Sequence, residues 1–142
     1  MKPLTRLDDW EPRLAAYLLR VRDRQWHRAR WDCARFVCGA VEAMTGHDPG
    51  IRLDYRTDLA ALRRLRLGGG LTAIVDAAAR PRGLGRIPPA AAGRGDLVAG
   101  EGDRWPWLGI HMADTVFSVL EGCALCSIPQ PLLTAAWRLP HD

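Results

Sequence analysis

Cys33 is the residue whose type and position most directly suggest chemistry. It follows Asp32 at the expected start of a helix, where unpaired backbone N–H groups and the helix dipole stabilise a thiolate. The thiolate is the nucleophilic form of cysteine. The charge of Asp32 would instead raise the pKa of the thiol, and free cysteine is among the residues most often buried. A nucleophile and a packed core residue are therefore both open interpretations of Cys33.

A cysteine nucleophile requires an imidazole within hydrogen-bonding reach, usually held by a third polar group. The sequence has four histidines, at positions 27, 47, 111 and 141. Only His111 lies in an expected strand of the core, so it is the candidate base, although a lone histidine on a strand is more often a packed or solvent-facing residue. Cys33 and His111 are thus the two candidate catalytic residues.

The remaining cysteines do not make up a recognisable metal site. Cys123 and Cys126 have the C-x-x-C spacing of metal ligands and redox pairs, but a four-cysteine zinc site needs a second close pair. Cys33 and Cys38 would face different sides of one helix, so they do not provide that pair. We expect incidental or structural cysteines, and we expect no metal ion and no cofactor.

Arginine supplies nearly all of the basic charge. Of the 20 basic side chains 19 are arginine, and the formal net charge is +4. Arginines that alternate with tryptophans at 20–35 could bind single-stranded nucleic acid, but Asp23 and Asp32 interrupt the run and no nucleic-acid-binding motif accompanies it. We therefore expect genome bias and protein contacts to explain the arginines, not nucleic acid. The candidate interface anchors, of which we expect about half to be core residues, are Trp26, Trp31, Trp105 and Trp107.

Length and composition indicate one globular domain over residues 1–142. The chain is 48% hydrophobic and 25% charged, which is ordinary for a folded domain. No apolar run reaches the roughly 18–20 residues that span a bilayer, and the first residues lack the apolar core of a signal peptide. We expect neither a membrane span nor an export signal.

Helices are expected in the first part of the chain and strands in the second. Apolar spacing and capping residues predict helices at Asp8–Asp23, at Asp32–Gly46, from Thr57 to the glycines at 68–70, and at Ala73–Ala79 with Thr72 as cap. Residues 80–95, with three prolines and four glycines, have the composition of a connector. Short β-type runs follow at 97–99, 108–112, 115–120 and 137–139. This order predicts an α+β domain, with helices packed on a small antiparallel sheet.

Several short motifs resemble the NlpC/P60 family, which belongs to the papain-like cysteine peptidase superfamily. Residues 30–37 (RWDCARFV) and 45–49 (TGHDP) are similar to the segment around the cysteine helix of that family. Residues 94–98 (RGDLV) resemble its "GDLV" strand, and residues 108–110 (LGI) resemble the following "VGI" strand. Over nearly its whole length the chain most resembles a small phage- and prophage-associated branch, a domain of unknown function.

The resemblance implies a papain-like α+β fold and a set of functional roles. Enzymes of this superfamily typically cut the γ-D-glutamyl–diamino acid bond of peptidoglycan, and in tailed phages such domains are components of the tail tip or hub. Cys33 matches the nucleophile. The base would be the histidine just before "VGI", where this sequence has Trp107, and the third polar group would lie where it has Val119.

Two of the three catalytic positions therefore depart from the family pattern. His111 lies four residues beyond Trp107, about 13 Å along an extended strand, so it replaces the missing base only if a bulge or a register shift re-aims it. The leading hypothesis is a structural protein of a phage tail tip or hub with a degenerate catalytic site. Such a protein would be made in the cytoplasm of the bacterial host, reside in the virion tail and contact other tail or hub proteins.

The first alternative is an active cysteine peptidase that cleaves peptidoglycan stem peptides at host entry, with Cys33 as nucleophile and His111 as base. A nucleic-acid-binding module on the Arg20–Arg35 segment is a weaker third possibility, which predicts affinity that falls steeply with salt.

Overall fold

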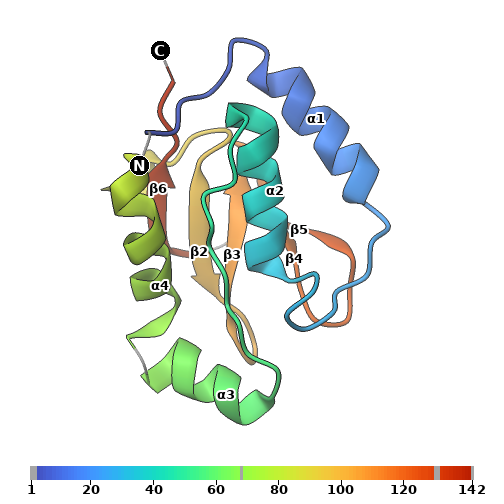
Figure 1. Cartoon of the computed structure of the whole chain (residues 1–142). Coiled ribbons are helices and arrows are strands. Elements are labelled where there is room, and N and C mark those ends of the chain that lie inside the picture. The colour runs from blue at the N-terminus through green and yellow to red at the C-terminus, as the bar shows by residue number, and fades with distance from the viewer. Residues whose placement is uncertain (1–2, 68, 130–131, 142) are drawn as a thin grey trace.

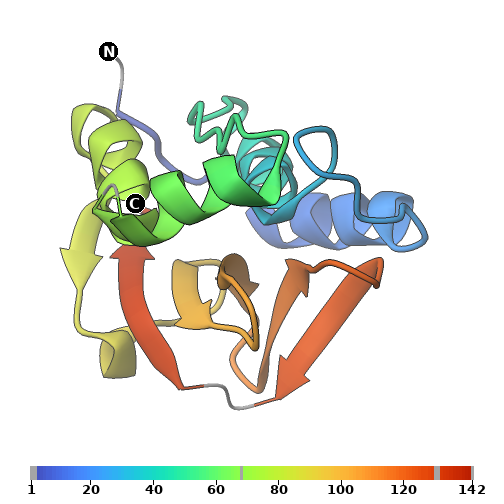
Figure 2. The same ribbon diagram turned by 90° about the horizontal axis from the view of Figure 1, so that it is seen from below.

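The helices come first in the chain and pack on one side of a sheet formed by the second half. The computed structural model describes residues 3–67, 69–129 and 132–141. The helices are α1 (Trp10–Val21), α2 (Cys33–Thr45), α3 (Asp58–Leu62), which continues as a π-helical turn at Arg63–Leu67, and α4 (Gly70–Ala79). Figures 1 and 2 show these helices on one face of the sheet. The expected α+β architecture is confirmed.

The sheet is antiparallel and has six strands in the order β1-β6-β2-β3-β4-β5. The strands are β1 (Gly85–Ile87), β2 (Leu97–Glu101), β3 (Pro106–His111), β4 (Thr115–Val119), β5 (Leu125–Pro129) and β6 (Leu133–Arg138). Each strand contributes a side chain to a second apolar cluster on the face away from the helices, centred on Trp107 and Val116. The sheet therefore curls around this cluster while its other face packs on the helices (Figure 2).

Helix α2 is the central helix of the domain, and its sequence specifies both of its ends. The Asp32 carboxylate accepts a hydrogen bond from the Arg35 N–H at 2.9 Å and so caps the N-terminus. Gly46 ends the helix at φ 87°, a left-handed conformation that glycine adopts without steric cost. The expected apolar stripe is fully buried: Phe36, Val37, Ala40, Val41 and Met44.

The structure corrects several element boundaries. Helix α4 begins at Gly70, with Gly69 as its N-cap residue, so Thr72 lies inside the helix and does not cap it. The third helix changes to π-helical geometry at Arg63, and its expected end at Gly68 lies outside the described residues. The connector at 80–95 contains β1, which pairs with β6, and β5 was not expected at all.

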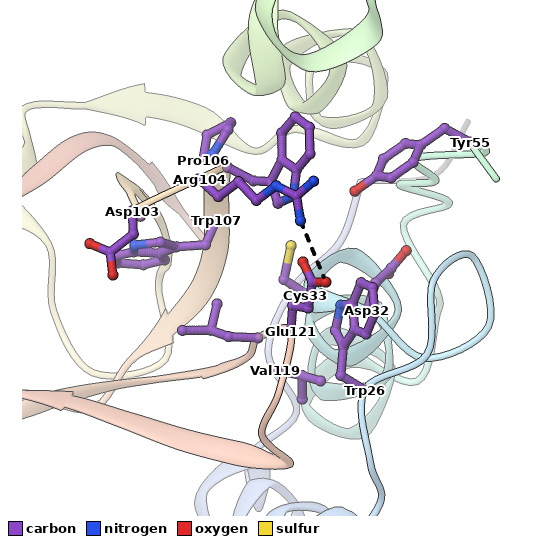
Figure 3. Close-up of a pocket in the computed structure, with 13 residues that line it drawn as sticks. Trp26, Asp32, Cys33, Tyr55, Asp103, Arg104, Pro106, Trp107, Val119 and Glu121 are labelled. Carbon is purple, nitrogen blue, oxygen red and sulfur yellow. Dashed lines mark ion pairs between the residues drawn. The ribbon is translucent and has the colours of Figure 1, made fainter. Parts of the chain in front are cut away.

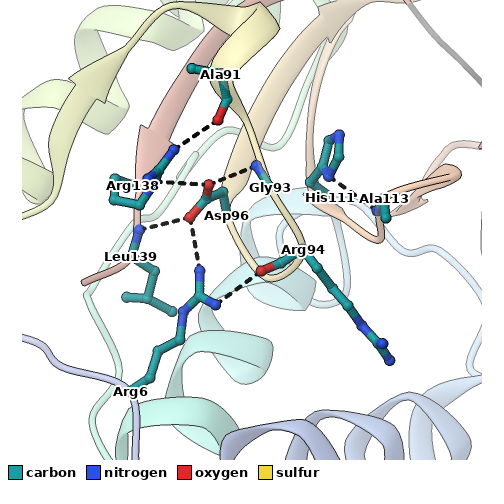
Figure 4. A network of polar contacts seen from close by, with 9 residues as sticks. All are labelled: Arg6, Ala91, Gly93, Arg94, Asp96, His111, Ala113, Arg138 and Leu139. Atoms are coloured by element: carbon teal, nitrogen blue, oxygen red, sulfur yellow. Dashed lines mark hydrogen bonds and ion pairs between the residues drawn. The ribbon is translucent and has the colours of Figure 1, made fainter. Parts of the chain in front are cut away.

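Asp96, in the RGDLV segment, holds the two ends of the chain together. Its buried carboxylate accepts hydrogen bonds from Arg6 Nη2 at 2.8 Å and Arg138 Nε at 3.1 Å (Figure 4). It also accepts from the backbone N–H groups of Gly93 and Leu139, at 2.9 and 3.1 Å. The aspartate of this motif therefore acts as a structural residue here.

None of the helices in the described part of the chain is both long enough and apolar enough to cross a membrane.

Candidate functional site

A cavity of about 340 Å³ opens at the N-terminal end of α2, with Cys33 at its wall. It lies between the loop before α2, the Tyr55 segment, the β2–β3 turn and the end of β4 (Figure 3). Its lining residues are Trp26, Asp32, Cys33, Tyr55, Gly102, Asp103, Arg104, Trp105, Pro106, Trp107, Val119, Leu120 and Glu121. This cavity is the candidate functional site, because it contains the one residue that both its type and its position single out.

The Cys33 thiol is protonated at neutral pH. The side chain is buried, and this burial, aided by the negative charge of Asp32, raises the pKa of the thiol to about 12. Backbone N–H groups of Leu108 in β3 and of Ala34 and Cys33 at the start of α2 act in the opposite direction but do not outweigh burial. Burial also raises the pKa of the Asp32 carboxyl. The helix N-terminus therefore does not produce a thiolate here.

The Trp107 indole packs on the face of the sheet opposite α2, although Trp107 is also among the residues that line the cavity. Along β3, Leu108 and Ile110 belong to the core beneath the helices, whereas Trp107 belongs to the second cluster. Its indole packs over Gly100, where an added Cβ would lie 2.3 Å from a ring carbon. Figure 3 shows the indole pointing away from Cys33. Because strand side chains alternate, a histidine at position 107 would also point away from the thiol.

The structure does not bring His111 and Cys33 together. His111 ends β3 on the same face as Trp107, and no bulge interrupts the pairing of β3 with β2. Its Nδ1 accepts a hydrogen bond from the Ala113 N–H at 3.1 Å, beyond the end of the strand (Figure 4). The register shift that would re-aim it toward Cys33 is absent from these two described strands.

The other three histidines also lie away from the cavity. His27 is exposed, with Nδ1 3.0 Å from the Arg28 carbonyl oxygen. His47 follows the far end of α2, and His141 packs edge-to-face with Trp10 at 6.3 Å between ring centroids. All four histidines fall within the described residues, and none lines the cavity.

The position that the resemblance matches to the third catalytic residue is apolar. This residue, Val119, is buried at the end of β4 and lines the cavity. The neighbouring hydroxyl of Ser118 faces the other side of the strand and donates to the Leu108 carbonyl oxygen at 2.7 Å. No polar side chain of β4 is therefore available to orient a base.

Aromatic rings and an ion-pair network surround the thiol instead. Asp58 pairs with both Arg28 and Arg104, and Arg104 also lies 3.8 Å from Glu121 (Figure 3). The Arg28 guanidinium lies over the Tyr55 ring at 5.3 Å. Of these charged residues, Arg104 and Glu121 line the cavity, together with an aromatic wall made by Trp26, Tyr55 and Trp105.

One polar hydrogen of this wall has no hydrogen-bond partner among the described residues. The indole Nε1 of Trp105 is buried and makes no hydrogen bond to any described residue. Burial raises the pKa of the Tyr55 hydroxyl, and the nearby Cys33 and Asp32 add to the effect. The wall therefore consists of neutral donors on large apolar rings, which suits an occupant with a hydrogen-bond acceptor beside apolar groups.

Part of this site could be predicted from the sequence. Trp26 and Trp105 are half-buried at the cavity, while Trp31 and Trp107 are core residues, so the expectation that half of the four tryptophans are core is confirmed. Tyr55, Arg104 and Glu121 were missed because they come from three separate loops and carry no spacing pattern that relates them to Cys33.

The remaining cysteines have structural contacts. Cys123 and Cys126 form a disulfide at the start of β5. The Cys38 thiol is buried and donates to the Ile51 carbonyl oxygen at 3.3 Å. Within the described residues there is no group of three or more side chains that could hold a metal ion.

Comparison with known proteins places the sequence in one family. A search of curated proteins finds no match. Residues 5–139, nearly the whole chain, match the family described as "Domain of unknown function (DUF6950)". The chain therefore belongs to the DUF6950 family.

Proposed function

We propose that this protein is a structural component of a phage tail tip or hub, built on an NlpC/P60-like scaffold whose catalytic site has degenerated. The observation that carries the proposal is the state of Cys33, a buried and protonated thiol with no histidine lining its cavity. A thiol in this state lacks both the charge and the base that a nucleophile needs.

The scaffold part of the proposal rests on the motifs around residues 30–49 and 94–110. In support, Asp32 and Cys33 begin the central helix, the RGDLV segment leads into β2, and the LGI segment lies within the adjacent antiparallel strand β3. The virion tail as location, and synthesis in the host cytoplasm, follow from the phage-associated branch that the sequence resembles.

The partners in this proposal are other tail or hub proteins. Trp26 and Trp105 at the cavity, with Arg28 over the Trp26 ring and Arg104 over the Trp105 ring, provide the residue types that are enriched at the centres of protein interfaces. A partner side chain with a hydrogen-bond acceptor beside apolar groups would accept the hydrogen bond of the Trp105 N–H and fill the cavity.

Digestion of purified muropeptides tests the loss of catalysis. We expect the wild type, Cys33→Ala and the control Cys38→Ala to release no products, because the thiol is not activated. Release by the wild type and by Cys38→Ala, but not by Cys33→Ala, would overturn the proposal. That result would establish the alternative, a cysteine peptidase acting on peptidoglycan, which the position of a thiol in the cavity wall favours.

Location in the particle tests the structural role directly. Mass spectrometry of purified virions, compared with the soluble lysate, should find the chain in the particles at a fixed ratio to known tail proteins. A phage lacking the gene should assemble defective tails, and complementation with Cys33→Ala should restore them. Absence from particles, together with normal tails in the deletion, would contradict the proposal.

A further inference from the structure

Strand β5 is an open edge of the sheet. It comprises Leu125–Pro129 and pairs with β4 along its full length, from Thr115↔Pro129 to Val119↔Leu125. Among the described residues no strand lies beyond it, and Figure 2 shows it as the outermost strand on its side of the sheet. An edge strand presents unpaired backbone N–H and C=O groups, which can pair with another extended chain.

This edge lacks the charges that usually protect such strands. The sequence has no charged side chain between Glu121 and Arg138, although 25% of all residues are charged. Ser127 and Pro129 are exposed, and Leu132 just beyond is 90% exposed. Natural edges are commonly protected by charged residues, proline or short length, and here only Pro129 and the shortness of the strand provide protection.

The edge is also held in a fixed conformation. The Cys123–Cys126 disulfide closes the start of β5, and the Cys123 carbonyl oxygen accepts from the Trp26 N–H at 3.4 Å. In the middle of the strand the hydroxyls of Thr115 and Ser127 lie 2.6 Å apart. An ordered strand loses less conformational freedom when it binds, so this edge is prepared for pairing.

We propose that β5 pairs antiparallel with β5 of a second copy of this chain about a two-fold axis, which joins the two sheets into one. Antiparallel pairing of identical strands is self-complementary, and each strand supplies the same groups to the other. Because the strand is neutral, no like charges face each other across the axis. A charged partner strand would find no counter-charge on β5, so a second copy fits this edge better.

The opposite edge of the sheet does not offer the same surface. β1 has only three residues, and its central Arg86 pairs with Asp76 at 3.1 Å. Pairing β1 with a second copy would bring two arginines close together. This inference concerns the assembly of the protein and is independent of the proposed function.

Sedimentation velocity over a wide concentration range tests the proposal. We expect a reversible monomer–dimer equilibrium, and we expect Ser127→Lys to weaken it at least tenfold, because two lysines would meet at the axis. Gly85→Lys is the matched control: it places the same charge on the exposed β1 edge, where nothing lies within 4 Å of an added Cβ, and it should leave the equilibrium unchanged.

Hydrogen exchange of the wild type supplies a readout that requires no variant. The β5 amides should exchange more slowly at high protein concentration than at low concentration, while the β1 amides should not change. A wild type that stays monomeric with concentration-independent β5 exchange would overturn the proposal. A dimer that Ser127→Lys and Gly85→Lys weaken equally would also overturn it.

Discussion

The two buried thiols of α2 share one chemical state, and burial is its main cause in both. Burial and Asp32 raise the pKa of Cys33 to about 12, and burial and Asp48 raise the pKa of Cys38 to about 12. A thiol whose pKa is raised by folding is neutral in the folded protein at pH 7 and above, up to the folded pKa. The unfolded chain, with a thiol pKa near 8.5, ionises earlier.

Both cysteines should therefore resist alkylation. With iodoacetamide at about pH 8 we expect labelling at Cys33 and Cys38 to be at least a hundredfold slower in the folded protein than in denaturant, because thiolate and access are both lacking. Mass spectrometry of timed samples measures the rates. Rapid labelling of Cys33 alone in the folded protein would show an activated thiol and contradict this account.

The same raised pKa values predict that the free energy of unfolding decreases at high pH. The neutral thiols stabilise the fold fully below the unfolded pKa, and this contribution decreases as pH rises from about 9 toward 12. Urea titrations at pH 7 and pH 10 should show a lower free energy of unfolding at the higher pH. The Cys33→Ala/Cys38→Ala double variant should show a smaller difference between the two pH values.

Position 107 shows why restoring the expected residue would not restore the site. We expect Trp107→His to remain inactive on muropeptides, because the side chain at 107 faces away from Cys33. Loss of the indole should also lower the free energy of unfolding by about 2–4 kcal/mol. Muropeptide release by Trp107→His that disappears in the Cys33→Ala/Trp107→His double variant would refute this geometry.

At the scale of elements, the helix boundaries depend on single residues. Gly46 ends α2 at φ 87°, so Gly46→Ala should lower the free energy of unfolding by about 1 kcal/mol. Gly85→Ala is the control, because Gly85 lies in a strand without positive φ and has nothing within 4 Å of an added Cβ. Chemical denaturation measures both, and equal losses would contradict the assignment of the cap.

The elements that could be predicted are those specified locally. Asp32 and Gly46 mark the ends of α2 in the sequence, and its apolar spacing marks the buried face. By contrast, β1 forms because it pairs with β6, about fifty residues later in the chain. No sequence pattern within 85–87 predicts that pairing. The change to π-helical geometry at Arg63 likewise has no local signal.

Of the candidate site, the position of Cys33 at the start of a helix could be predicted from the sequence. The Asp32-Cys33 helix start could be inferred from the sequence, but the side on which β3 residues face depends on how the strand packs against α2. The family pattern has its catalytic base at the position of Trp107, whereas the side chains of β3 that face the core with Cys33 are Leu108 and Ile110. A shift of one residue along a strand moves each side chain to the other face of the sheet, which is enough to separate two catalytic residues.

At the scale of the whole molecule, Asp96 joins the first and last segments of the chain. Asp96→Asn should lower the free energy of unfolding by about 3–5 kcal/mol, because it leaves the Arg6 guanidinium, 8% exposed, without its counter-charge. Asp9→Asn, which removes the exposed pair with Arg13, should leave the free energy of unfolding almost unchanged. Urea denaturation compares them, and similar losses would contradict a central role for Asp96.

The contacts that hold the first and last described segments lie at the opposite end of α2 from the cavity. The Arg6 N–H donates to the Pro140 carbonyl oxygen, and the Leu7 N–H donates to the Met44 carbonyl oxygen, both at 2.8 Å. Arg6 and Pro140, close to the two ends of the described chain, thus lie near the C-terminal end of α2, whereas Cys33 begins that helix about 18 Å away. A protein fused to either end of the chain would therefore attach on the side of the domain away from the cavity and leave the cavity accessible to a binding partner.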